Sequence, residues 1–136
     1  MADKGGDRIM ELKNRSQYLD KLISVQDMEV IKVVTGIRRC GKSSLLKLMM
    51  AHLREQGVME EQILSMNFES MQFADMDSKS LYQYVTERES KGKRLYLFLD
   101  EVQKVRDWQD AVNSFRVDLD CDIYVTGSNA YLLSSE

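Results

Sequence analysis

The chain has 136 residues, of which 43% are hydrophobic, and a formal net charge of −3. This is the size of one domain with a real core. It contains no basic run that would indicate a direct nucleic-acid surface and no apolar run near the roughly 18–20 residues that cross a membrane. Its start lacks the apolar stretch of a signal peptide. The two cysteines, Cys40 and Cys121, have neither metal-ligand spacing nor a disulfide framework, so we expect a cytoplasmic protein.

The N-terminal part predicts a loose segment followed by a folded core. Residues 1–12 are polar and hold the pair Gly5-Gly6, so they offer little apolar surface to offset the entropy of ordering. We therefore place the folded core at residues 13–136. A short helix through Leu22 and Ile23 begins it, and the β-branched run 29–35 predicts a strand.

Strands and helices then alternate along the chain. Leucines and methionines recur at helical spacing from Lys42 until Gly57, which is a stop signal. Further strands are predicted at 63–68, 94–99 and 122–126, with helices around 81–85 and 108–119 between them. Residues 94–99 are almost wholly apolar, as in strands buried on both faces of a parallel sheet. The alternation predicts a doubly wound α/β fold.

A glycine-rich loop lies between the first strand and the following helix. Residues 36–43 read Gly-Ile-Arg-Arg-Cys-Gly-Lys-Ser and match the pattern G-x-x-x-x-G-K-[ST]. Its backbone N–H groups would face a phosphate, Lys42 would reach the β- and γ-phosphates, and the Ser43 hydroxyl would bind Mg²⁺. A glycine turn without a ligand is the alternative, which the strand–loop–helix context disfavours. The predicted nucleotide-binding residues are Gly36, Ile37, Arg38, Arg39, Cys40, Gly41, Lys42, Ser43 and Ser44.

Polar residues end two of the later strands. Asp100 and Glu101 follow the apolar strand 94–99. Ligands of open α/β sheets bind at the carboxyl ends of the strands, which we call the C-terminal edge of the sheet. Asp100 would hold Mg²⁺ through water, and Glu101 would polarise the attacking water. At the end of the fourth strand, Thr126, Ser128 or Asn129 would hold this water or sense the γ-phosphate. A helix cap is the alternative role for Ser128 and Asn129.

Three segments carry a resemblance to a known family. The runs 35–46, 98–105 with Trp108, and 126–130 resemble prokaryotic AAA-type ATPases whose core precedes a C-terminal nuclease-like domain. The resemblance implies a P-loop NTPase three-layer sandwich of the additional-strand type, with strand order 5-1-4-3-2 and the fourth strand between the loop strand and the acidic strand. It implies ATP or ADP with Mg²⁺, the acidic pair above, and Ser128 or Asn129 as sensor. It also implies that the chain is an N-terminal fragment without the fifth strand, the lid and the C-terminal domain.

These features predict an ATPase whose hydrolysis drives motion of domains absent from the fragment, with Lys42, Glu101, Ser128 and Asn129 as catalytic residues. A nucleotide-dependent switch or scaffold with little turnover is the alternative, and a small-molecule P-loop kinase a weaker one, because no lid or acceptor site is evident. A GTPase is disfavoured because no Asn-Lys-x-Asp guanine reader occurs. The missing fifth strand would leave the edge of strand 30–35 free, so we expect self-association across it and slow hydrolysis by the isolated chain.

Overall fold

The computed structural model describes residues 17–28, 30–34, 39–90 and 92–127, with the side chains of residues 39–41 excepted. The predicted loose segment 1–12 lies outside these residues, as do Gly36, Ile37 and Arg38 of the loop and the predicted sensors Ser128 and Asn129.

A parallel sheet of four strands forms the centre of the described molecule. The strands are β1 (Lys32–Val34), β2 (Ile63–Asn67), β3 (Leu95–Asp100) and β4 (Cys121–Thr126). Their order is β1-β4-β3-β2, and each neighbouring pair is parallel. The fourth strand therefore lies between the loop strand and the acidic strand, as the resemblance implied. A fifth strand is not among the described elements, and β1 begins at Lys32, so residues 30 and 31 of the predicted run 29–35 lie outside the strand.

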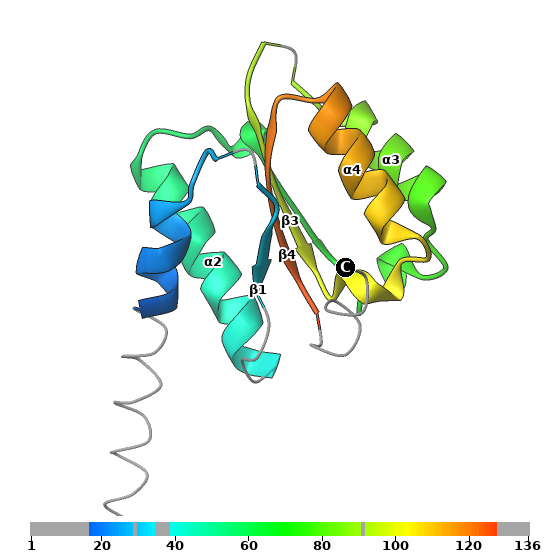
Figure 1. Cartoon of the computed structure of the whole chain (residues 1–136), viewed down its shortest axis with the longest axis horizontal. Helices are drawn as coiled ribbons and strands as arrows, with labels where there is room; N and C mark the ends of the chain where they lie inside the picture. Colours follow the sequence, from blue (N-terminus) through cyan, green and yellow to red (C-terminus); the bar gives the residue numbers. More distant parts are fainter. Residues whose placement is uncertain (1–16, 29, 35–38, 91, 128–136) are drawn as a thin grey trace, which may run out of the picture.

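Helices cover both faces of this sheet (Figure 1). A helix that includes residues 17–24 packs with α2 (Arg39–Glu55) on one face. On the other face lie α3 (Ser78–Glu87) and α4 (Trp108–Asp118). Short 3₁₀ turns at Glu60–Gln62, Met71–Phe73 and Val102–Lys104 join the elements. This arrangement confirms the predicted α/β fold with a helix–sheet–helix layering.

The acidic strand lies at the centre of the core. All six residues of β3 are buried, as its apolar sequence predicted. Leu95, Leu97 and Leu99 face the α3 and α4 side, whereas Tyr96 and Phe98 pack with α2 and the helix containing residues 17–24. Because successive side chains of a strand point to opposite faces, a strand covered on both sides must be apolar throughout.

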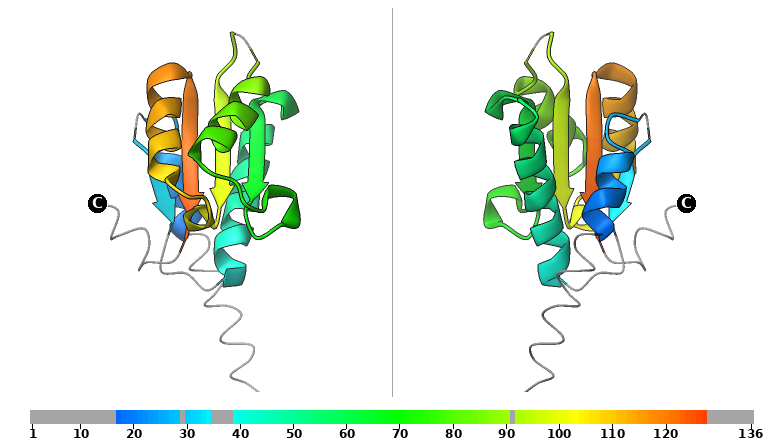
Figure 2. Two further views of the ribbon diagram at one scale, coloured as in Figure 1. Left: turned by 90° about the vertical axis from the view of Figure 1, so that its right-hand side faces the viewer. Right: turned by 90° about the vertical axis from the view of Figure 1, so that its left-hand side faces the viewer.

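Parallel pairing brings the polar ends of the strands together. All strands point the same way, and α2 begins at the edge where they end (Figure 2). The residues that follow β3 and β4 therefore lie beside the first turns of α2.

Candidate functional site

The start of α2 supplies a lysine and a serine to this edge of the sheet. Lys42 is buried, and its Nζ donates a hydrogen bond of 3.1 Å to the carbonyl oxygen of Gly127, just after β4. The same Nζ lies 3.3 Å from Oε1 of Glu101. The hydroxyl of Ser43 donates to Oδ2 of Asp100 at 2.6 Å. Lys42 and Asp100 are 58 positions apart in the sequence. The fold thus brings the end of the phosphate loop and the acidic pair together.

The two acids have different environments although they are neighbours. Asp100 is the last residue of β3, is 7% exposed, and its carboxylate accepts hydrogen bonds from Ser43 and Thr126. Glu101 has a left-handed backbone with φ 59° and ψ 49°. This conformation costs a non-glycine residue roughly 1–2 kcal/mol and is common where function fixes the chain. The turn directs Glu101 to Lys42 while Asp100 stays with Ser43.

Thr126 connects both acids to β4. Its side chain is fully buried; its Oγ1 donates to Oδ1 of Asp100 and accepts the N–H of Glu101 at 2.9 Å. A hydroxyl has a single proton, and here that proton goes to a carboxylate. The structure therefore gives Thr126 the role of holding the acidic pair, whereas the sequence had suggested contact with water or phosphate.

Gln103 is a site residue that the sequence analysis did not single out. Its Nε2 donates to Oε2 of Glu101 at 2.7 Å. It lies in the 3₁₀ turn Val102–Lys104, and the flanking Val102 and Val105 are buried in the core. The only sequence signal was its place two residues after the acidic pair. The contact depends on the left-handed turn at Glu101, which the sequence pattern does not reveal.

The other predicted residues whose side chains the structure describes make no side-chain contact with this cluster that the structure records. Ser44 is half-buried in α2 next to Ser43, and the backbone of residues 39–41 forms the first turn of that helix. Glu69, an acid near the same edge, is exposed. No group of three or more His, Cys, Asp or Glu side chains forms a metal site among the described residues.

Ser43 and Asp100 fit a magnesium ion as a ligand pair. Their side-chain oxygens lie 2.6 Å apart, and one is a carboxylate. Mg²⁺ usually binds through one or two carboxylates while it keeps several waters and takes substrate phosphates as ligands. A single carboxylate with a hydroxyl beside a phosphate loop matches this requirement.

The N-terminal ends of the strands, which we call the N-terminal edge of the sheet, hold a second polar cluster. Lys32 and Asp122, both buried, form a salt bridge between the starts of β1 and β4. Asp122 also accepts from the hydroxyl of Tyr124 at 2.6 Å and the N–H of Asp27 at 3.0 Å. Burial and the bond to Asp122 raise the pKa of Tyr124, so its phenol stays protonated as a donor.

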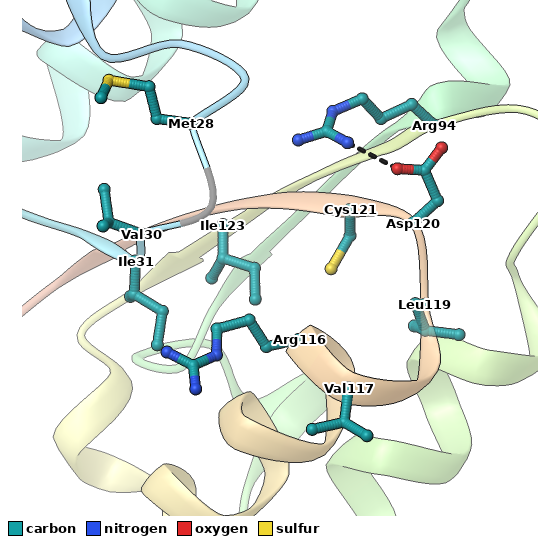
Figure 3. Close-up of a pocket in the computed structure, with 10 residues that line it drawn as sticks. All are labelled: Met28, Val30, Ile31, Arg94, Arg116, Val117, Leu119, Asp120, Cys121 and Ile123. Carbon is teal, nitrogen blue, oxygen red and sulfur yellow. Dashed lines mark hydrogen bonds and ion pairs between the residues drawn. The ribbon is translucent and has the colours of Figure 1, made fainter.

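A pocket of about 400 Å³ lies near that cluster and not at the phosphate loop (Figure 3). An ion pair between Arg94 and Asp120 borders it. Burial raises the pKa of the Cys121 thiol in its wall to about 11, which makes this cysteine a weak nucleophile at neutral pH. The lining residues are Met28, Val30, Ile31, Arg94, Arg116, Val117, Leu119, Asp120, Cys121 and Ile123.

A family model described as an AAA domain matches residues 29–136. The chain belongs to this AAA domain family. The match covers the sheet, the phosphate loop and the acidic pair, and it supports a nucleotide-binding P-loop domain.

Two relatives extend this comparison. An uncharacterized protein of Haemophilus influenzae is 42% identical over 125 residues, which is 90% of this chain and 31% of the relative. An uncharacterized protein of Methanocaldococcus jannaschii is 26% identical over 129 residues, covering 93% of this chain and 28% of the relative. The chain thus spans about a third of the length of these relatives. No solved structure matches it. Within the described residues, no helix is long and apolar enough to cross a membrane.

Proposed function

We propose that the chain is the ATP-binding core of an AAA-type P-loop ATPase that hydrolyses ATP with Mg²⁺. The observation that carries this proposal is the meeting of Lys42 and Ser43 with Asp100 and Glu101 at one edge of the sheet. A phosphate-binding lysine, a metal-binding pair and a second carboxylate for water are the groups that hydrolysis of a nucleoside triphosphate requires.

Each residue has a separate task in this mechanism. Backbone N–H groups of residues 36–44 hold the phosphates, and Lys42 leaves Glu101 and Gly127 to bind the β- and γ-oxygens. Ser43 and Asp100 hold Mg²⁺, which neutralises phosphate charge when bound. Glu101 accepts a proton from the attacking water. Ser128 or Asn129 lies after β4 and would contact the γ-phosphate.

The family context extends the proposal to the whole protein. Because the relatives are about three times as long as the matched stretch, we propose that hydrolysis drives motion of parts outside it. A fifth strand beside β1, a lid and a nuclease-like C-terminal domain belong to this proposal, as does a cytoplasmic location.

One observation favours a second candidate function, a nucleotide-dependent switch with little turnover. The carboxylate of Glu101 is engaged by Lys42 and Gln103, and these contacts compete with the activation of water. If nucleotide failed to separate Lys42 from Glu101, the site would bind and not hydrolyse.

Calorimetric titration with Mg²⁺ and ATP, ADP or GTP tests the proposal. We expect ATP and ADP to bind and GTP to bind more weakly, because no guanine reader is present. Lys42→Ala should abolish binding, since it removes the charge that faces the phosphates. Lys47→Ala, at an exposed position of the same helix, is the matched control and should bind as wild type does. Equal affinity for GTP would refute the adenine preference, and normal binding by Lys42→Ala would refute the site.

A further inference from the structure

Among the residues that the structure describes, the carboxylate of Glu101 has one side-chain partner on each oxygen. Lys42 Nζ lies 3.3 Å from Oε1, and the amide Nε2 of Gln103 donates to Oε2 at 2.7 Å. The first partner is charged and also donates to the carbonyl of Gly127. The second is neutral and comes from the turn that directly follows Glu101.

Nucleotide binding affects these two partners differently. The triphosphate carries several negative charges, and Lys42 lies in the first turn of α2, so in the proposed mechanism it moves from Glu101 to the phosphates. After that move, Gln103 is the only described residue whose side chain holds the carboxylate of Glu101. Without it, a glutamate next to a bound triphosphate would be repelled from the attacking position.

We propose that Gln103 is a positioning residue that holds Glu101 in place during hydrolysis after Lys42 has moved to the nucleotide. This inference rests on the proposed ATPase function. A carboxylate only accepts hydrogen bonds, so the amide must present Nε2 to it. A neutral donor suits a base, because it holds the carboxylate in place without pairing its charge with a cation.

The surroundings of Gln103 agree with a fixed orientation. The turn begins at the left-handed Glu101 and is anchored by the buried side chains of Val102 and Val105. The amide oxygen of Gln103 is buried and has no partner among the described residues. Such an acceptor is costly to leave unpaired, and it is available to a donor such as a water molecule.

Gln103→Met tests the proposal because methionine keeps the length of the side chain and removes the donor. In single-turnover hydrolysis of labelled ATP we expect the rate to fall roughly tenfold, a part of the usual contribution of a general base. The dissociation constant for ATP should stay within about twofold, since Gln103 does not contact phosphate in this scheme. Gln103→Glu should lose more, because it places a second carboxylate beside the first. Gln83→Met, on an exposed position of α3, is the matched control and should behave as wild type.

A spectroscopic measurement supplies a readout that does not depend on turnover. The side-chain amide NMR signals of Gln103, assigned by their loss in Gln103→Met, should keep their hydrogen-bonded shifts when Mg²⁺ and ADP are added. They should move toward the free values in Glu101→Ala. Both results together would support the positioning role.

The outcomes separate the two proposals. If wild type hydrolyses ATP and Gln103→Met does so at the same rate, Gln103 has no positioning role while the ATPase function stands. A parallel loss of affinity and thermal stability in Gln103→Met would also overturn the inference, by assigning a structural role. If wild type neither binds nor hydrolyses ATP, the proposed function fails, and the role of Gln103 fails with it.

Discussion

The N-terminal and C-terminal edges of the sheet each hold a buried lysine beside a carboxylate, and the two pairs differ in their partners. Lys32 bonds to Asp122 and to the carbonyl of Met28, and it lies over the ring of Tyr124. Every partner of that cluster comes from the protein itself. Lys42 lies 3.3 Å from Glu101, and among the described residues its other hydrogen bond goes to the carbonyl of Gly127. We call the first pair saturated because Asp122 also accepts hydrogen bonds from Tyr124 and from the N–H of Asp27, whereas Glu101 has Gln103 as its one further side-chain partner among the described residues.

This difference separates a charge pair that serves the fold from one at the proposed nucleotide site. Burying two charges is costly unless both find hydrogen bonds, and the Lys32 cluster meets this condition. The nearby phenol of Tyr96 is likewise hydrogen-bonded, to Asp27. Burial and this bond raise the pKa of Tyr96 to about 12, so its hydroxyl stays a donor. A lysine that must reach phosphate cannot be saturated in this way, since each bond made to the protein would have to be broken on binding.

The largest effect is expected from breaking the saturated pair. Asp122→Asn leaves Lys32 buried without a counter-charge, so the free energy of unfolding should fall by roughly 3–5 kcal/mol. Urea denaturation without nucleotide measures it. Asp118→Asn is the matched control: Asp118 also accepts a tyrosine hydroxyl, from Tyr82, but is exposed, so the loss should stay below about 1 kcal/mol.

Lys42→Met sharpens the comparison in the same assay. It removes the lysine of the unsaturated pair and leaves Glu101 with its bond to Gln103. We expect a far smaller loss than for Asp122→Asn, because sites built for ligands contribute little to stability. Equal losses from the two substitutions would mean that both lysines serve the fold.

The next effect concerns the acid of the unsaturated pair, Glu101. Glu101→Gln keeps the shape of the side chain and removes the base, so hydrolysis should fall at least about a hundredfold. It also frees Lys42 from its counter-charge, so ATP should bind equally well or a few times more tightly. Single-turnover hydrolysis and calorimetry measure the two quantities. Glu69→Gln, at an exposed acid near the same edge, is the control and should change neither.

A Glu101→Gln variant that hydrolysed ATP at the wild-type rate would show that another residue activates the water. Weaker binding of ATP by this variant would show that the ion pair does not compete with nucleotide.

The sequence predicted which residues gather at the C-terminal edge of the sheet but not the buried cluster at the N-terminal edge. The phosphate-loop lysine and the acidic pair follow local patterns, and parallel strands bring such patterns to one edge. Lys32 and Asp122 are 90 positions apart and belong to strands that read as ordinary apolar runs. A single buried charge in a strand gives no signal of its partner, so this cluster could not be predicted.

The limits of the sequence within the site have a similar cause. Thr126 was recognised as a site residue, but its role depends on the register that places β4 beside β3. The role of Gln103 depends on the left-handed backbone of Glu101, which sterics disfavour for glutamate. Local patterns thus identify which residue types gather at a strand end, whereas their hydrogen bonds follow from tertiary geometry.

The smallest predicted effect concerns the apolar surface near the saturated pair. Val30, Val33 and Val117 are at least half exposed, and Val30 and Val117 also line the pocket in Figure 3. β1 pairs with β4 on one side, and no described strand lies on the other. An edge strand with apolar side chains is a surface to which another chain can add.

We propose that the isolated chain self-associates across this edge of β1, and Val33→Lys tests the proposal. The middle residue of β1 is 50% exposed, so lysine fits without strain, and a charge on an edge strand opposes pairing with a second copy. Multi-angle light scattering over a concentration series should show that wild type associates and that Val33→Lys does so roughly ten times more weakly, a change of about 1.4 kcal/mol. Met71→Lys is the matched control, because Met71 is 87% exposed in the turn after β2, the strand on the other side of the sheet from β1, and its replacement should leave association unchanged. Equal weakening by both substitutions would mean that association follows net charge and not the β1 edge, and a wild-type chain that stays monomeric at high concentration would refute the proposal outright.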